Sequence, residues 1–442
     1  MRIRTADRPD ATAVEQPPEV TLNVSAAATV RPPRRPVGRL GALSAPTYRR
    51  YWLGSLGSVG ASQLIVMGQG WLIVDKLGGS PLALGLLGAA TAVPTIAVNL
   101  FGGVLADRLN RRIVLMATSL LSALLLLILA TLDVTGAVQI WHVVLIAAGM
   151  GLVYGIDWPT RNAYFPALID REHTMSAVAL NAMLWQGTRI VAPAIGGIAI
   201  AEFDTAPVFF LCVLGFSVMF LILIGLNVPQ ARFEGDKNAF RELKEGIRFI
   251  ADHRLFAVLI LLSYSHMFFA MSYIQMMPLV AKEFGVGSAG LGLLLTVIGI
   301  GAVSGTLVTL RLQGSNRLGR NMLVAVFVAT FLILGFALSP IYPMALVMLY
   351  FASLANSVFQ ISSMTALQMR VPDHMRGRVM GIHAITFSML ALGALFGGLV
   401  ANFTNVRIAI ATGAMTMTCI VVVVALTQES IRGLGSSAAF EE

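Results

Sequence analysis

Charged side chains inside long apolar runs are the residues of this sequence most able to do chemistry. Arg189 is the clearest case, because a guanidinium at such depth is costly and normally faces a cavity or a partner. No carboxylate stands at an equal depth in the sequence. We therefore expect Arg189 either to bond backbone carbonyls and fix helix packing, or to bind an anionic substrate or take part in ion coupling.

Asp157 and Arg161 form a second charged pair, four residues apart near the end of an apolar run. This spacing places both on one helical face, where we expect them to pair. The pair is a helix-end salt bridge, a second gate element or a protonation site. His266, near the middle of another run, either titrates near neutrality when solvated or acts as a hydrogen-bonding packing residue.

The sequence lacks the motifs that nucleotide hydrolysis, zinc catalysis and thiol redox chemistry require. The sequence contains no G-x-x-x-x-G-K-[ST] phosphate loop, no H-E-x-x-H zinc motif and no C-x-x-C pair. Cys212 and Cys419 stand in apolar runs and are expected to behave as small hydrophobic residues. We therefore predict no enzyme activity, no metal and no cofactor, and energy for any work must come from an ion or solute gradient.

The elements that must position these residues are long apolar helices. Of the 442 residues, 57% are hydrophobic and 12% are charged, whereas a soluble globular protein carries about 25% charged residues. The apolar residues come in runs of about 20, the length of helix that spans ~30 Å of hydrocarbon. The predicted spans are 51–74, 82–105, 113–132, 139–159, 175–200, 207–228, 254–280, 289–311, 321–338, 343–367, 378–401 and 407–427.

The distribution of lysine and arginine predicts the orientation of these spans. If the N-terminus is cytoplasmic, most basic residues lie in cytoplasmic loops and tails, and the other side has only Lys76, Lys282 and Arg407. The formal net charge of +9 is then a topology signal, and we expect no nucleic-acid binding. The sequence predicts a multi-pass protein of the bacterial cytoplasmic (inner) membrane with both termini in the cytoplasm.

Polar segments divide the chain. Before the first span the sequence is rich in Pro, Ala, Val, Thr and Arg, and we expect a disordered cytoplasmic tail. The longest internal polar stretch separates the spans six and six, and its apolar residues recur as on an amphipathic surface helix. The predicted parts are the tail 1–45, the first bundle 46–228, the linker 229–253, the second bundle 254–427 and a cytoplasmic tail 428–442.

The two halves share a sequence register. Gly196-Gly197 in the fifth span corresponds to Gly397-Gly398 in the eleventh, and Glu172-His173 corresponds to Asp373-His374. The offset is the same for both pairs and equals six spans. Parallel six-helix repeats are an architecture of secondary transporters, in which the substrate site lies at the repeat interface near the middle of the membrane.

The loop after the second span reads GVLADRLNRR over residues 103–112. It resembles the major facilitator superfamily signature G-x-L-a-D-r-x-G-r-r, with Asn110 at a position where the signature has glycine. Asparagine tolerates a positive φ, so we expect the turn to survive. The cluster either clamps the two halves in one state until it is broken or protonated, or is a basic loop that sets topology. The predicted gating or coupling residues are Asp107, Arg108, Arg111, Arg112, Asp157, Arg161 and Arg189.

The resemblance extends over nearly the whole chain beyond residue 45. Within the superfamily the chain resembles the branch of enterobactin exporters and macrolide-efflux proteins. This implies an all-α fold of twelve transmembrane helices in two pseudo-symmetric six-helix bundles, and a proton-coupled exporter of a small, often amphipathic compound. The segments that carry the resemblance are WLIV 71–74, GSPLALG 79–85, DWPTR 157–161, RIVAPAIGG 189–197 and VPDHMRGRVMG 371–381.

The fifth span is similar to the antiporter motif G-x-x-x-G-P-x-x-G-G of drug exporters. Pro193, Gly196 and Gly197 are present, whereas Thr188 and Ala192 replace two glycines. Small residues let helices approach closely and proline bends the helix. The motif therefore indicates either an exporter or ordinary close packing of membrane helices.

Polar and aromatic residues recur in the spans that line the substrate cavity in this superfamily and in the fifth and eleventh spans. We expect a small-molecule substrate, a proton or another ion, and membrane lipid as partners of a monomeric chain. The alternatives are an importer or lipid flippase of the same fold, or a non-transporting membrane sensor. The candidate cavity residues are Gln63, Gln69, Trp185, His266, Tyr273, Gln275, Asn356, Gln360 and His383.

Overall fold

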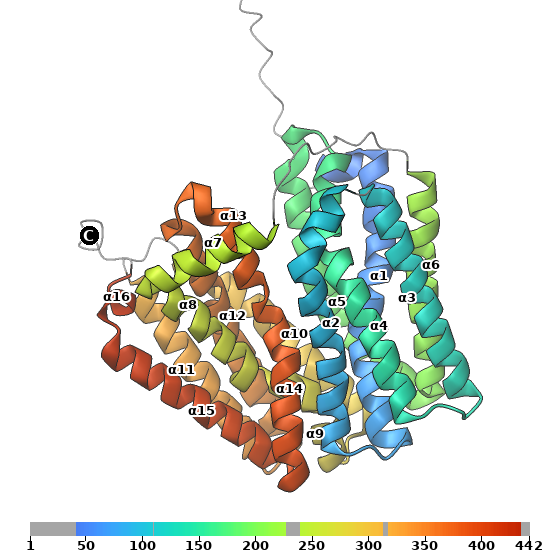
Figure 1. The fold of residues 1–442 in the computed structure, drawn as a ribbon. Helices are drawn as coiled ribbons and strands as arrows, with labels where there is room; N and C mark the ends of the chain where they lie inside the picture. Colours follow the sequence, from blue (N-terminus) through green and yellow to red (C-terminus); the bar gives the residue numbers. More distant parts are fainter. Residues whose placement is uncertain (1–40, 109, 227–238, 313–316, 435–442) are drawn as a thin grey trace, which may run out of the picture. The chain divides into compact units, whose positions relative to one another are not determined.

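The structure is a computed structural model that describes residues 41–108, 110–226, 239–312 and 317–434 (Figure 1). All regular secondary structure in these ranges is helical. Among the described residues, eleven segments are long and apolar enough to cross a membrane. The remaining long helix, α5 (Thr174–Phe203), has 30 residues but carries polar side chains that lower its hydropathy. With α5 as the twelfth span, the structure is consistent with the predicted count.

The first six spans keep the predicted order and extend a few residues beyond most of the predicted ends. Short 3-10 turns, η3 (Phe165–Leu168) and η4 (Arg171–His173), connect the fourth and fifth spans. The six spans are α1 (Pro46–Trp71) with the π-helix η2 (Leu72–Lys76), α2 (Pro81–Arg108), α3 (Arg111–Val134), α4 (Ile140–Tyr164), α5 and α6 (Thr205–Gly225).

The second six spans also keep their order, but the seventh and the eleventh are not single helices as predicted. The seventh consists of α8 (Arg254–Ser265), the π-helix η5 (His266–Ala270), the 3-10 helix η6 (Ser272–Met276) and α9 (Met277–Glu283). The others are α10 (Gly287–Leu312), α11 (Leu318–Ala337), α12 (Tyr342–Arg370), α13 (Asp373–Ala384) followed by α14 (Thr386–Phe403), and α15 (Val406–Thr427).

Packing between helices explains both breaks. Glycines of α14 and α15 stand directly against the backbone carbonyls of η5: Gly393 meets Phe268 and Gly413 meets Phe269. In a π-helix the backbone hydrogen bonds depart from the α pattern, and neighbouring helices can pack closely against such a segment. At the second break, the Tyr264 hydroxyl donates a 2.6 Å hydrogen bond to the carbonyl of Ile382, near the end of α13. Each break is thus stabilised by a neighbouring helix.

Asn110 is the N-cap residue of α3. We expected asparagine to tolerate a positive φ at this position, but its φ is negative. Its φ is −65°, and its side-chain carbonyl accepts hydrogen bonds from the N–H groups of Arg112 and Ile113 at 3.0 and 3.3 Å. Asparagine is a preferred N-cap residue because it satisfies N–H groups that have no partner within the helix.

Ordered structure begins earlier and ends later than the predicted tail boundaries. The 3-10 helix η1 (Gly41–Ser44) precedes α1, and the N–H of Ala42 donates to the Ser176 hydroxyl at 3.1 Å. At the other end α16 (Glu429–Arg432) follows α15, and the carbonyl of Leu434 accepts from the N–H of Gly319 at 3.1 Å. The expectation of disorder over 1–40 lies outside the described residues.

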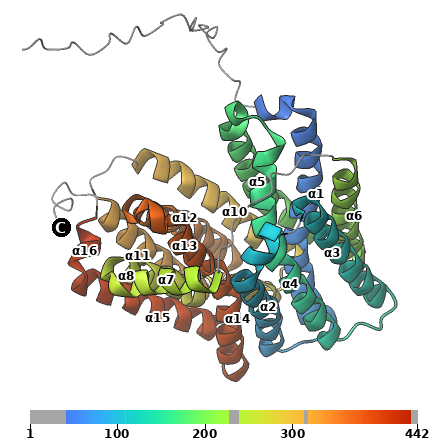
Figure 2. The ribbon, with the colours of Figure 1, turned by 45° about the horizontal axis from the view of Figure 1, so that its top comes forward.

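Two faces of the bundle are used below. The terminal face is the end at which α1 begins and α15 ends, and it also carries α7 (Ala239–Asp252), the helix of the central linker. The opposite face is the other end, where α5 passes to α6. At the terminal face α7 lies along α13 (Figure 2), with Gly246 against Arg378 and Ile382. The linker therefore contains an ordered helix that packs on the second half.

Two glycine pairs bring the halves into backbone contact, and each pair is defined here as a seam. In the first seam, a Cβ on Gly197 of α5 would lie 2.9 Å from the Cα of Gly292 in α10. In the second, a Cβ on Gly398 of α14 would lie 3.0 Å from the Cα of Gly85 in α2. Gly197 and Gly398 are the positions that the internal repeat makes equivalent, so the repeat is structural.

We expect Gly197→Ala to destabilise the protein, because its added methyl would lie 2.7 Å from the carbonyl oxygen of Ser288. Overpacking of this kind costs about 1–3 kcal/mol. Gly187→Ala is the matched control, since a Cβ there meets nothing within 4 Å on the same helix. Thermal unfolding of the purified proteins measures both; equal midpoints for the two variants would contradict the seam.

Candidate functional site

Arg111 and Arg112 of the signature loop cap the ends of other helices in the first half. Arg111 donates to the carbonyl of Ala163 at 3.1 Å. Arg112 donates to the carbonyls of Leu223 and Ile224 at 2.7 and 2.5 Å. Cations are favourable at the carbonyl end of a helix, so these contacts fix α3 against α4 and α6. The side chains of Asp107 and Arg108 lie outside the described residues, and the gate they were predicted to form stays a prediction.

Asp157 and Arg161 form the expected pair, with Nε 2.9 Å from Oδ2. Both are mostly buried, at 15% and 8% side-chain exposure. The pair also joins three helices, which its spacing alone did not indicate. Thr118 of α3 donates to Asp157 at 2.8 Å, and Arg161 donates to the hydroxyl of Ser58 in α1 at 3.2 Å. These contacts lie within the first half, so the pair is more than a helix-end bridge.

Arg189 of α5 does not bond backbone carbonyls. Within the described part of the chain, its guanidinium makes no hydrogen bond or ion pair. It does interact electrostatically with the phenol of Tyr273, which belongs to η6 in the other half. Both interpretations of Arg189, helix packing on one side and anion binding or coupling on the other, therefore stay predictions.

The residues of the antiporter-like motif serve the packing between helices. Gly197 and the carbonyl of Pro193 both abut Gly292 of α10. A Cβ on Gly196 would lie 2.5 Å from the side chain of Leu64 in α1. The motif thus holds α5 against a helix of each half. This close packing is common to both interpretations of the motif.

His266 and Asn356 form a buried polar pair between the seventh and tenth spans. The imidazole Nε2 lies 2.6 Å from the Asn356 side-chain oxygen, and the histidine is fully buried. Its Nδ1 has no partner among the described residues. Next to this pair, Gln360 donates to the sulfur of Met267 at 3.8 Å. The structure therefore brings together three of the candidate cavity residues around η5.

The other candidate cavity residues are spread over four helical segments. Trp185 packs edge-to-face on Trp158 of α4, with ring centroids 4.8 Å apart. The amide nitrogen of Gln69 and Nε2 of His383 are buried and unpaired among the described residues. Gln63 in α1 and Gln275 in η6 are half-buried. These side chains do not form one hydrogen-bonded cluster in this state.

A charged cluster at the opposite face was not foreseen from the sequence. Lys76 lies 2.6 Å from Asp133 and 2.8 Å from Asp204, and so ties the ends of α1, α3 and α5. Burial opposes ionisation of Asp204, but hydrogen bonds from Lys76 and Thr205 outweigh it and hold the pKa of this carboxyl below its usual range. The three residues are far apart in the sequence, so no local pattern connects them.

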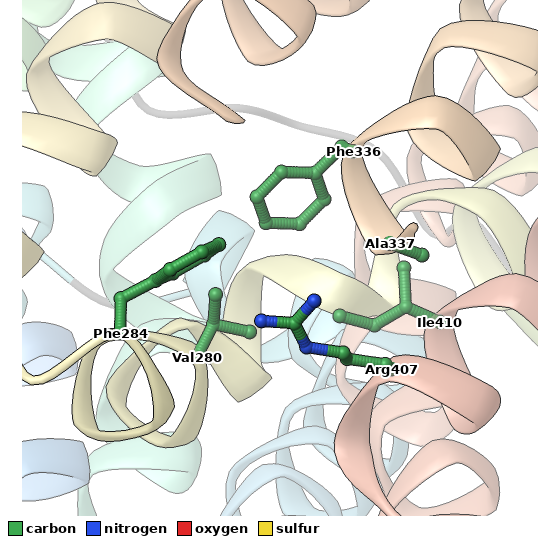
Figure 3. A pocket seen from close by; sticks show the side chains of 6 residues that line it. All are labelled: Val280, Phe284, Phe336, Ala337, Arg407 and Ile410. Carbon is green, nitrogen blue, oxygen red and sulfur yellow. The ribbon is translucent and has the colours of Figure 1, made fainter. Parts of the chain in front are cut away.

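A small pocket at the opposite face holds the Arg407 guanidinium (Figure 3). Its volume is ≈ 10 Å³, which is about the space of one water molecule. Arg407 is already satisfied by Glu283 at 2.9 Å, by the carbonyl of Ser339 at 2.7 Å and by the ring of Phe284. The pocket is therefore structural and is not the site of a substrate.

Glu245 of α7 anchors the linker helix to α13. It pairs with Arg241 on its own helix and, at 3.0 Å, with Arg378. The hydrogen bond from Arg241, together with the charge of Arg378, lowers the pKa of Glu245. This contact joins the linker to the segment that follows the tenth span.

We expect Arg161→Met to destabilise the first half strongly, because it leaves Asp157 mostly buried without a counter-charge. Breaking a buried pair in this way costs about 3–5 kcal/mol. The double variant Asp157→Asn with Arg161→Met is expected to recover part of the loss, since neither charge then remains. Chemical unfolding of the purified variants measures the coupling. A double variant as unstable as the sum of the singles would show that the two residues do not act as a pair.

Acidification is expected to release α7 from α13. The pKa of Glu245 is lowered in the folded protein. The contribution of this carboxylate to the stability of the α7–α13 contact is therefore fully present above the usual glutamate pKa of about 4.3. It is lost as the pH falls through the lowered pKa. The mobility of a nitroxide at the exposed Ile247 should therefore rise in that acidic range. In Glu245→Gln it should be high at every pH. An unchanged acid transition in this variant would rule out Glu245 as the anchor.

Comparison with known proteins agrees with this architecture. A family model described as transmembrane secretion effector matches residues 37–439. The enterobactin exporter EntS of Salmonella typhi is 30% identical over 318 residues, which are 71% of this chain and 76% of that protein. The staphyloferrin A transporter of Staphylococcus aureus is 22% identical over 359 residues, or 81% of this chain and 90% of that protein.

Solved structures give the same fold at low identity. The nucleoside transporter NupG has a TM-score of 0.68 at 14% identity, covering 87% of this chain and 99% of that one. A bacterial homologue of the iron transporter ferroportin has a TM-score of 0.65 at 14% identity, covering 85% and 98%. The chain is thus a multi-pass membrane transporter and not an enzyme. It belongs to the transmembrane secretion effector family of the major facilitator superfamily.

Proposed function

We propose that this chain is a secondary active exporter of a small amphipathic compound, such as a siderophore, drug or metabolite, driven by a proton or other ion gradient. It acts as a monomer in the bacterial cytoplasmic membrane, with its terminal face in the cytoplasm. The relatives that carry enterobactin and staphyloferrin A support this substrate range. The concentration of lysine and arginine in the loops of the terminal face supports the orientation.

The observation that carries the proposal is the set of contacts between the halves near the opposite face. The Lys282 ammonium of α9 donates a 2.9 Å hydrogen bond to the carbonyl of Val74 in η2. A Cβ on Gly70 of α1 would lie 2.9 Å from the Pro278 ring. These contacts hold α1 and η2 against α9, which favours a state that is closed at the opposite face. These contacts support a state that is open toward the terminal face, from which an exporter takes up its substrate.

Alternating access then follows from the two seams. Each seam joins helices of different halves through bare backbone, without long side chains that would have to be withdrawn during motion. The halves can rock about these seams, opening the contact between Lys282 and Val74 while the terminal ends approach. Rocking of one bundle against the other around a fixed central site is the general mechanism of such folds.

The energy source is an ion gradient, because the sequence has no phosphate loop. The candidate proton carriers are Asp107, Asp157 and a histidine. Asp157 is held by Arg161 and Thr118, so protonation would loosen three helices at once. His266 can take a second proton only at Nδ1, which has no partner among the described residues, while Nε2 keeps its hydrogen bond to the Asn356 side-chain oxygen.

Export is tested in a bacterium that lacks its own exporters and expresses this chain. We expect lower accumulation of at least one compound from a panel of catecholate and carboxylate siderophores, macrolides and dyes. An uncoupler should abolish the difference. Lys282→Met should reduce export several-fold because it removes the closing contact to Val74, whereas Arg432→Met at the exposed end of α16 should not.

Other outcomes separate the rivals. Higher accumulation of a compound would indicate an importer. Movement of labelled lipid between leaflets of vesicles, without flux of the panel, would indicate a flippase. No flux of any kind, with the protein in the membrane at normal amounts, would favour a sensor and contradict the proposal.

A further inference from the structure

Arg189 faces the junction of the two halves. It lies two turns before Gly196 on one face of α5, and Gly196 abuts Leu64 of α1. The adjacent face of α5 abuts the second half, where the carbonyl of Ile190 accepts a 3.0 Å hydrogen bond from Thr296 of α10. The guanidinium therefore projects from the border between α1 of its own half and α10 of the other.

The two polar groups that interact across this junction, Arg189 and Tyr273, can both donate hydrogen bonds. Arg189 is a donor only, and its guanidinium interacts with Tyr273 of the second half. The Tyr273 hydroxyl makes no hydrogen bond to any described residue. The nearest acidic residue along these spans, Asp157, is already engaged by Arg161 and Thr118. A ligand that brings negative charge and acceptor oxygens would supply what this junction lacks.

Two indole rings extend the same surface. Trp185 is one turn before Arg189, so both lie on one stripe of α5. Trp185 packs edge-to-face on Trp158, which is 47% exposed and stands in the last two turns of α4. Paired rings that stay open on one side suit a flat aromatic group, because offset and edge-on ring contacts add to simple burial.

We propose that Arg189 and the Trp158–Trp185 pair bind a substrate in which an anionic oxygen group is attached to an aromatic ring, such as an aromatic carboxylate or phenolate. The anion lies against Arg189, the ring lies against the two indoles, and the Tyr273 hydroxyl donates from the second half. This inference rests on the proposed export function and names the substrate class for it. Neither the pairing of the two indoles nor the electrostatic interaction of Arg189 with Tyr273 is visible in the sequence alone.

The site would also make binding sensitive to the state of the transporter. Arg189 and Tyr273 belong to different halves, so the distance between them changes when the halves rock about the seams. A ligand held by both donors stabilises the arrangement in which they converge. Binding then shifts the population of states by as much as its affinity differs between them.

Binding to the purified full-length protein in lipid nanodiscs tests the site directly. The probes are 2,3-dihydroxybenzoate, the uncharged 2,3-dihydroxybenzamide and the non-aromatic cyclohexanecarboxylate, measured by calorimetry. We expect the benzoate to bind best. Arg189→Gln should weaken it about 10- to 100-fold and leave the benzamide nearly unchanged, and Arg189→Lys should retain part of the affinity.

Trp185→Leu should lower the ratio of the affinities for the aromatic and the non-aromatic carboxylate about 3- to 10-fold. Trp185→Phe should keep most of this ratio. Trp141→Leu is the matched control, because Trp141 is 57% exposed and stacks on its neighbour His142 at the opposite face. Equal binding of the two carboxylates by the unmodified protein would overturn the proposal, as would an unchanged benzoate affinity in Arg189→Gln.

Flux measurements on the same variants separate the two proposals. Export of other compounds that is insensitive to Arg189→Gln would leave the exporter function standing and overturn this site. Binding that depends on Arg189 and Trp185 without flux of any compound would support the site and contradict the exporter function.

Discussion

Backbone contact through glycine is the interaction on which the rest of this structure depends. In a membrane, helices associate by close packing and not by the hydrophobic effect, so small residues decide where two bundles touch. Gly197 with Gly292 and Gly85 with Gly398 bring α5 to α10 and α2 to α14. Because both contacts use backbone, no long side chain has to be withdrawn if the halves tilt about them. Every functional group of the transporter is placed relative to these two seams.

The seams explain where polar chemistry is tolerated. Charges within the first half are bonded to each other or to helix ends, as in the pair of Asp157 and Arg161. Arg189, which stands next to the first seam, is left without a bonded partner in the described part of the chain. The non-α segment η5 and the buried pair of His266 and Asn356 lie on the other side of the junction. Among the described residues, two groups with unused hydrogen-bonding capacity, Arg189 and Nδ1 of His266, therefore lie on the two sides of this junction.

Much of the fold could be predicted because membrane spans are encoded locally, by apolar runs and basic loops, and the repeat by a constant offset. The breaks in the seventh and eleventh spans could not, since η5 depends on Gly393 approaching from α14. In the candidate site, the sequence singled out Arg189 and the pair of Asp157 and Arg161 because they are charged residues within apolar runs. The partners of such groups were missed, because Ser58 lies 103 residues from Arg161 and only tertiary packing unites them.

Rocking about the seams is most directly measured by pulsed electron spin resonance between nitroxides on the two halves, in a cysteine-free background. One pair, Met175 with Met369, reports the terminal face, and the other, Phe203 with Phe403, reports the opposite face; all four positions are exposed. Our account predicts that adding a transported compound shortens distances in the first pair while lengthening those in the second. Distances that stay fixed, or that change in the same direction at both faces, would contradict it.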